Sequence, residues 1–139
     1  MRYLLTGLLF FLSIYCTNAQ DTALIIGSGG GVVGTATVYK ITPDGKVLKG
    51  GGMDTYTYSA GSKVKKSIAK KLFRTSNKLG LESLQFNHPG NLYYFLTTTS
   101  QSGSNTVTWG DNAHATPDDI KAFYADVMKR IKSLSFRPL

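Results

Sequence analysis

Short apolar runs rich in β-branched and aromatic residues recur along the chain, separated by glycine, proline and small polar residues. These runs occupy residues 24–26, 35–41, 46–49, 53–58, 92–98 and 106–109. Run 35–41 alternates apolar and polar positions, which is the pattern of a half-buried strand, and run 53–58 places Tyr56 and Tyr58 on one face. Run 92–98 is apolar on both faces at its start, and this predicts a central strand. The glycine triplet 50–52 is expected to interrupt the strand that precedes it.

Two further segments have the periodicity of amphipathic helices. Apolar or small residues recur every three or four positions, at Val64, Ile68, Leu72, Thr75 and Leu79 in the first segment and at Ile120, Phe123, Val127, Ile131 and Leu134 in the second. Ser62 is expected to cap the start of the first helix and Gly80 its end. Thr116 is expected to cap the second helix, with Pro117 at its first position.

The links between these elements are of hairpin length. Residues 42–45 carry proline and Asp-Gly turn chemistry, and Pro89-Gly90 predicts a type II turn at residues 88–91. Because the order is strands, helix, strands, helix, the sequence predicts one α+β domain over residues 20–139. In this domain two helices pack on one face of a mainly antiparallel sheet. Residues 137–139 are expected to form a frayed tail.

A glycine cluster lies between the first two predicted strands, at Gly29, Gly30, Gly31 and Gly34. Its letters match the G-x-G-x-x-G dinucleotide fingerprint, which requires a helix to follow because the helix N-terminus holds the pyrophosphate. The residues that follow are β-branched and aromatic, as in a strand. A tight bend or bulge between two strands is therefore favoured over a nucleotide site.

The first 19 residues have the features of a secretory signal peptide. Arg2 precedes an apolar run over residues 4–15, and the small residues Thr17 and Ala19 stand before Gln20. Cleavage after Ala19 is favoured over an uncleaved anchor or lipidation at Cys16. Cleavage would leave a secreted or periplasmic chain without cysteine, and no disulfide would contribute to its stability.

The chain is basic, with a formal net charge of +8, and part of the excess is concentrated in one block. The block comprises Lys63, Lys65, Lys66, Lys70, Lys71, Arg74 and Lys78. It predicts the solvated face of the first helix, or a surface that binds anionic lipid or polysaccharide, with Lys63, Lys66, Lys70 and Arg74 as the central cations. No recognised nucleic-acid motif accompanies it, so nucleic acid is not an expected partner.

Candidate catalytic groups are few. The only histidines are His88 and His114, both predicted to lie exposed in loops, and no G-x-S-x-G or H-E-x-x-H motif occurs. A zinc site built from them and Asp111 would require loops from unrelated positions to converge. We therefore expect no catalytic site, metal or cofactor, and a hydrolase that uses either histidine is the alternative.

The remaining candidates for function are binding residues on loops, namely Gly29, Gly30, Gly31, Gly34, Asn91, Trp109 and Asp111. Aromatic side chains on rigid loops are effective binding anchors because they bury much area at a low cost in entropy. Trp109 has a second interpretation, in which it fills the core between the sheet and the second helix.

Gly29–Gly34, the segment from Phe86 to Tyr93 and the Trp109-Gly110-Asp111 strand end occur in an order that resembles small exported bacterial proteins of unassigned function. More distantly, the layout is similar to emfourin, the protealysin-inhibitor family, whose members begin with a strand and a Gly-Gly-x-x-Gly turn. The resemblance implies a non-enzymatic module that binds another exported protein, with a protease as one such partner. It assigns no inhibitory residue.

Overall fold

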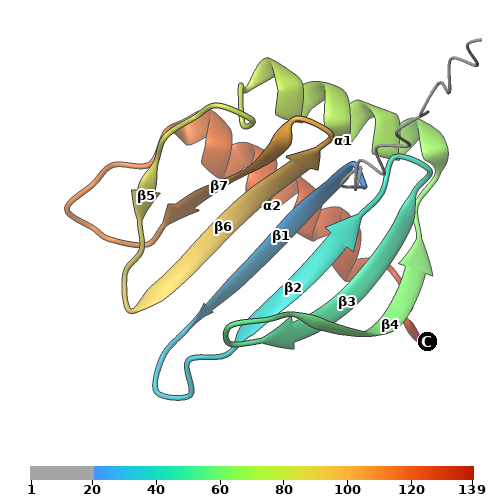
Figure 1. Ribbon diagram of the computed structural model, residues 1–139, viewed down its shortest axis with the longest axis horizontal. Helices are drawn as coiled ribbons and strands as arrows, with labels where there is room; N and C mark the ends of the chain where they lie inside the picture. Colours follow the sequence, from blue (N-terminus) through green and yellow to red (C-terminus); the bar gives the residue numbers. More distant parts are fainter. Residues whose placement is uncertain (1–20) are drawn as a thin grey trace, which may run out of the picture.

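Eight strands form one sheet, and two helices lie together on one of its faces, in the computed structural model of residues 21–139 (Figure 1). The strands are β1 (Ala23–Gly30), β2 (Ala36–Ile41), β3 (Lys46–Gly52), β4 (Thr57–Lys63), β5 (Asn87–His88), β6 (Leu92–Ser100), β7 (Gly103–Trp109) and β8 (Arg137–Pro138). The helices are α1 (Lys66–Lys78) and α2 (Asp118–Lys132). The predicted signal peptide lies outside the described residues.

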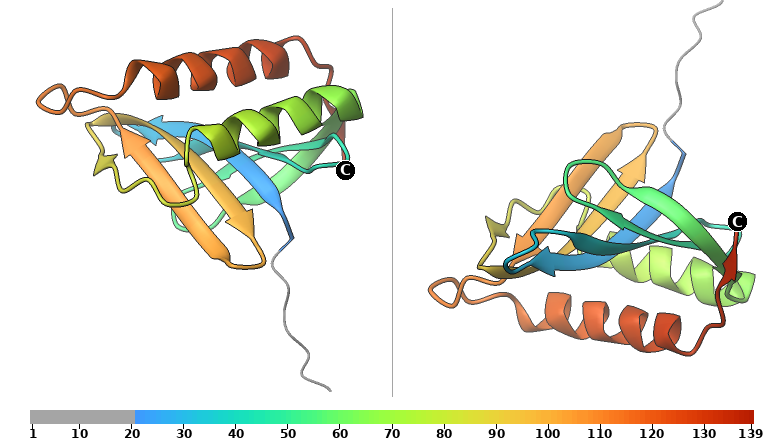
Figure 2. Two further views of the ribbon diagram at one scale, coloured as in Figure 1. Left: turned by 90° about the horizontal axis from the view of Figure 1, so that it is seen from above. Right: turned by 90° about the horizontal axis from the view of Figure 1, so that it is seen from below.

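The strand order across the sheet is β5-β7-β6-β1-β2-β3-β4-β8. Every neighbouring pair is antiparallel except β5 and β7, which run parallel over two residues. Figure 2 shows both helices on the same side of the twisted sheet. The predicted fold class, an α+β fold with a mainly antiparallel sheet, is confirmed. As predicted, β6 lies inside the sheet, between β7 and β1, although Leu92 and Tyr94 at its apolar start are exposed.

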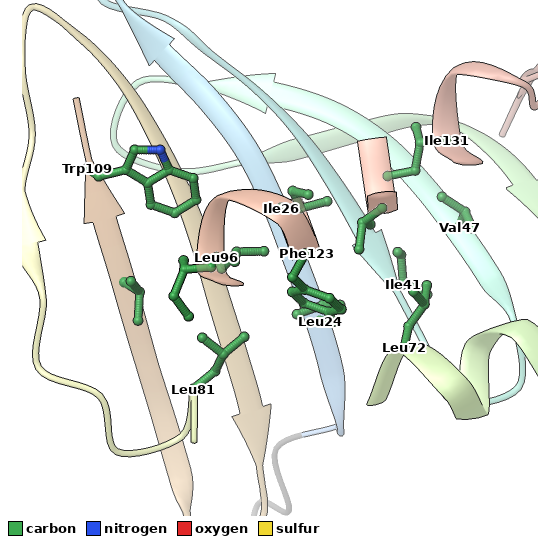
Figure 3. Close-up of a cluster of buried hydrophobic side chains, with 13 residues drawn as sticks. Leu24, Ile26, Ile41, Val47, Leu72, Leu81, Leu96, Trp109, Phe123 and Ile131 are labelled. Atoms are coloured by element: carbon green, nitrogen blue, oxygen red, sulfur yellow. The ribbon is translucent and has the colours of Figure 1, made fainter. Parts of the chain in front are cut away.

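The main core lies between the sheet and the helices. Leu24 and Ile26 on β1 face the helices, because alternate residues of a strand share a face. They pack with Leu72 of α1 and with Phe123 and Val127 of α2, all of which are buried (Figure 3). Of the predicted helix stripes, Ile120, Phe123, Val127, Ile131 and Leu72 are buried, while Val64, Ile68, Leu79 and Leu134 pack at the margin of the core.

A second, smaller core lies on the face of the sheet opposite α1 and α2 (Figure 2). It consists of Ala36, Val38 and Phe95, with Tyr58 and Tyr93 packed against them. The ring of Tyr56, just before β4, stacks on that of Phe95 in β6, with the ring centroids 6.0 Å apart. In the strand order β4 and β6 are separated by β1, β2 and β3. The β3–β4 hairpin therefore folds back over this face.

The starts of both helices differ from the prediction. Ser62 lies inside β4, because that strand continues to Lys63 in order to pair with Lys46 of β3. Helix α1 then begins at Lys66 after Lys65, with no side-chain cap. Helix α2 begins one residue later than expected, with Pro117 rather than Thr116 at the N-cap position. Neither helix has the length and apolar character needed to cross a membrane.

Three strand predictions are wrong in detail. The triplet 50–52 does not end β3, because all three glycines pair with β2, although the register against β4 shifts between Lys49 and Gly50. Residues 53–56 form a loop, and only Thr57 and Tyr58 of that run belong to a strand. The chain end is not frayed, because Arg137 and Pro138 pair with β4 and the Leu139 N–H donates to the Ser59 carbonyl at 3.1 Å.

Candidate functional site

Loops from distant parts of the sequence are joined at one end of the sheet. The loops are residues 31–35 between β1 and β2, residues 89–91 between β5 and β6, and residues 110–117 between β7 and α2. The Gly31 N–H donates to the Asn91 carbonyl at 2.9 Å, and the Asp111 N–H donates to the His88 carbonyl at 3.0 Å. These backbone hydrogen bonds fix the three loops relative to one another.

Two glycines, Gly30 at the end of β1 and Gly90 in the β5–β6 loop, are required by close backbone contacts. A side chain on Gly30, whose φ is +101°, would place its Cβ 2.0 Å from the Asn91 carbonyl oxygen. A Cβ on Gly90 would lie 2.5 Å from the Gly110 carbonyl oxygen. Gly90 has no positive φ, so the predicted type II turn at residues 88–91 is wrong. Gly90 is instead needed where two loops touch.

Large apolar side chains project from these loops and from the β3–β4 loop. Val32 and Val33 have relative exposures of 107% and 73%, and Met53 and Leu92 have exposures of 65% and 61%. Leu92 lies beside Gly31, and Met53 lies beside Gly34. We call Val32, Val33, Met53 and Leu92 the apolar tip. The sequence contained one signal for it, since Val32-Val33 is an apolar pair inside a glycine-rich turn, yet the candidate set did not include it.

Trp109 is not part of the exposed surface. It is 6% exposed and lies in the main core (Figure 3). Its ring meets that of Tyr124 edge-on, with the ring centroids 5.1 Å apart. The outer ring at this position is that of Tyr94, which stacks on Trp109 at 6.0 Å and is 40% exposed. Trp109 is therefore buried and does not present the exposed ring of a binding anchor, in agreement with the interpretation in which it fills the core.

The other candidates divide between loop and strand. Gly31, Gly34 and Asn91 lie in the joined loops, whereas Gly29 and Gly30 belong to the end of β1. Gly29 faces the second core, and a Cβ there would lie 2.7 Å from the Tyr93 hydroxyl. The predicted bend is therefore present, but it begins after Gly30. Gly30 allows the close approach of the Asn91 backbone, and Gly29 leaves room for the Tyr93 ring.

His88, His114 and Asp111 converge, contrary to the expectation that the two histidines lie in unrelated loops. Parallel pairing of β5 with β7 puts His88 opposite Trp109, directly before the loop that carries Asp111 and His114. The two imidazole rings stack with centroids 3.8 Å apart and planes within 8°. His114 Nδ1 lies 2.8 Å from Asp111 Oδ2.

This cluster has half of the arrangement of a catalytic triad, namely an imidazole oriented by a carboxylate. Within residues 21–139, the hydrogen bonds of His114 reach Asp111 but no serine or threonine hydroxyl. In the same part of the chain, no group of three or more His, Cys, Asp or Glu side chains is arranged to hold a metal ion. Stacked imidazoles have nearly parallel ring planes, so their nitrogens do not converge on one point.

Asp111 gives a direct test of this loop geometry. Hydrogen bonds from the Ala113 N–H, at 2.9 Å, and from His114 lower the pKa of the Asp111 carboxyl below its ordinary value, with His88 adding a smaller electrostatic contribution. A lowered folded-state pKa means that the stabilisation is present above the unfolded value and is lost as pH falls through the folded one. We expect an NMR titration of the carboxyl to show the lowered pKa. In the His114→Ala variant, the pKa of Asp111 should rise but stay below the ordinary value, because the hydrogen bond from the Ala113 N–H remains. A wild-type pKa at or above the ordinary value would contradict the loop geometry.

The basic block lies on and beside α1. Lys66, Lys70 and Arg74 are exposed on the helix, whereas Lys63 lies at the end of β4. Across the part of the chain that the structure describes, the ion pairs involve Asp111, Asp118 and Asp126, and none of them includes a cation of this block. Within residues 21–139, the cations of this block therefore make no direct ion pair with a carboxylate.

The fold and these surfaces define an α+β protein with a fixed loop cluster and an exposed apolar tip. No protein-family model matches the chain, and no curated protein matches it either.

Proposed function

We propose that this protein is an exported, non-enzymatic module that binds another exported protein through the apolar tip. The observation that carries the proposal is the exposure of Val32, Val33, Met53 and Leu92 at one end of the sheet. There a backbone hydrogen bond and a close glycine contact join the turn of Val32 and Val33 to the start of β6. Scattered apolar side chains are normal on a protein surface, but contiguous ones mark interaction sites.

The fixed position of the tip favours tight binding. An interface gains little from contacts that must first be ordered, so preorganised loops lose less conformational entropy on association. The Gly31–Asn91 hydrogen bond lies directly beside Val32. On the other side of Gly31, the backbone of Gly30 packs against the Asn91 carbonyl and so supports the same turn. A narrow apolar turn of this kind suits a concave partner surface. For this reason, and because of the resemblance to emfourin, thermolysin-like proteases are the partner class to test first.

The test uses the purified protein as bait for exported proteins and as an inhibitor of a thermolysin-like protease. Val32→Asp/Val33→Asp should weaken capture and inhibition by roughly thirtyfold or more, which corresponds to the loss of one interface hot spot of about 2 kcal/mol. Both side chains are exposed, so the variant should keep the wild-type melting temperature.

The matched control is Lys66→Glu/Lys70→Glu/Arg74→Glu, which changes an exposed face on α1. This control should capture the partner as well as the wild-type protein does. No partner and no inhibition, or equal capture by the tip variant, would overturn the proposal. Loss of capture only in the α1 variant, with strong weakening by salt, would favour instead the binding of anionic lipid or polysaccharide by the basic block.

A further inference from the structure

A cavity of about 700 Å³, open to solvent on one side, lies between α2 and the helix-facing side of β1 and β2. It is lined by residues of both layers, namely Gly27, Ser28, Thr37, Tyr39, Tyr94, Tyr124, Ala125, Met128, Lys129 and Lys132. Its size is within the range of small-molecule sites. The cavity exists because Ser28, Thr37 and Ala125 are too small to fill the space beside the core stripe of α2.

Three aromatic rings form a fixed wall. The Tyr124 hydroxyl donates to the Gly27 carbonyl at 3.1 Å, and the Tyr124 ring meets that of Tyr94 edge-on at 5.5 Å. Tyr94 in turn stacks on the buried Trp109, and Tyr39 contacts Phe136. Burial raises the pKa of Tyr124 to about 12, so its phenol remains a neutral hydrogen-bond donor. A ligand would therefore meet preformed apolar surfaces together with hydroxyl groups.

The charged groups of the lining are all of one sign. Lys129 and Lys132 lie three residues apart on α2, and the lining residues that the structure describes include no aspartate or glutamate. Arg130, the basic residue between them, is directed elsewhere, since its Nε lies 3.1 Å from Asp126 Oδ2. Among the described residues neither lysine takes part in an ion pair. Such a site favours an anion over a neutral molecule of the same shape.

We propose that this cavity binds a small organic carboxylate, with its apolar body against Tyr39, Tyr94 and Met128 and its carboxylate between Lys129 and Lys132. The site is separate from the apolar tip and does not depend on the function proposed above. The body is either an acyl chain or an aromatic ring, because Met128 and Ala125 suit the former and the tyrosine rings suit the latter.

The proposal is tested by calorimetric titration of the purified protein with decanoate and with 2-naphthoate. Decanol and 2-naphthamide serve as the neutral matches. At least one carboxylate should bind saturably at one site, and its neutral match should bind roughly tenfold more weakly or worse, as expected for the loss of a charged hydrogen bond. The decanoate and naphthoate arms distinguish the two kinds of apolar body.

Two variants locate the site. Lys129→Glu/Lys132→Glu should lower the affinity for the carboxylate at least about tenfold, and Ala125→Phe should lower it by occupying the cavity. Lys66→Glu/Lys70→Glu makes the same change in net charge on α1 and should bind like the wild-type protein. Val32→Asp/Val33→Asp should also keep this affinity, which separates the result from that of the apolar tip.

Three results would overturn the proposal. The first is that neither carboxylate binds saturably. The second is that the neutral matches bind as tightly as the acids, which would leave an apolar cavity without anion preference. The third is that the α1 charge variant loses as much affinity as Lys129→Glu/Lys132→Glu, which would reduce the effect to net charge. If Ala125→Phe fails to fold, the comparison of Lys129→Glu/Lys132→Glu with Lys66→Glu/Lys70→Glu still tests the proposal. All four lysines are exposed on helices, so their replacement should not prevent folding.

Discussion

Trp109→Ala should lower the free energy of unfolding by about 3–5 kcal/mol, the range for removing a large aromatic side chain from a core. Trp109 is 6% exposed and packs edge-on against Tyr124 in the main cluster. Its loss would leave a void beneath Tyr94, whose ring stacks on it. The surrounding strand cannot collapse into that void, because β7 is paired with β6 and at its end with β5.

Urea unfolding followed by far-UV circular dichroism measures this effect. Fluorescence cannot serve, because Trp109 is the only tryptophan. Trp109→Phe is the matched control and should cost clearly less, since it keeps an aromatic ring against Tyr124. If Trp109→Ala were as stable as the wild type and lost only partner binding, the side chain would be a surface anchor and its placement in the core would be wrong.

Much of the fold was predictable because its signals are local. The apolar stripes of α1 and α2 recur at helical spacing, and Phe123 and Val127 are buried as their positions predict. The runs around Leu24 and Leu92 have strand character, and the short links between strands favour hairpins. An antiparallel sheet with helices on one face follows from such local patterns, because each amphipathic element must bury its apolar side against another.

The features that were missed depend on contacts between distant segments. Nothing near residues 137–139 indicates a strand, because β8 exists only through its pairing with β4. His88 and His114 meet because a two-residue parallel bridge joins β5 to β7, which no sequence periodicity reveals. The cavity beside α2 likewise depends on the small size of Ser28 and Ala125 across two layers. Helix and strand propensities describe one segment at a time, so they give no information on contacts between segments that are distant in the sequence.

The glycine-rich character of β1 has a similar explanation. Gly27 stands opposite Phe95 in the sheet, and Gly29 stands opposite Tyr93. The rings of Phe95 and Tyr93 lie across these glycines on the face opposite α1 and α2, and the ring of Tyr56 stacks on that of Phe95 from the other side. Glycine opposite an aromatic residue is a known way to support a strand that lacks side-chain contacts. The cluster thus serves the second core as well as the turn.

Gly27→Ala should therefore be strongly destabilising, by about 3 kcal/mol, the upper part of the range for overpacking. The new Cβ would lie 2.6 Å from both the Phe95 ring and the Thr37 carbonyl oxygen. The backbone cannot yield, because Gly27 is paired with Val38 on one side and Phe95 on the other. Gly29→Ala is the matched comparison and should cost only about 1 kcal/mol, because its Cβ would mainly meet the outer end of the half-buried Tyr93 ring.

Urea midpoints of the two variants measure the difference, and Phe95→Ala separates the two clashes at Gly27. Removing the ring relieves one clash but leaves the contact with the Thr37 carbonyl, so Gly27→Ala should still destabilise the Phe95→Ala background. Alanine restricts the unfolded chain and stabilises a protein by about 0.4–1 kcal/mol where it fits without strain. A gain of that size at Gly27 would show that the strand has room for a side chain and that the second core is not packed against β1.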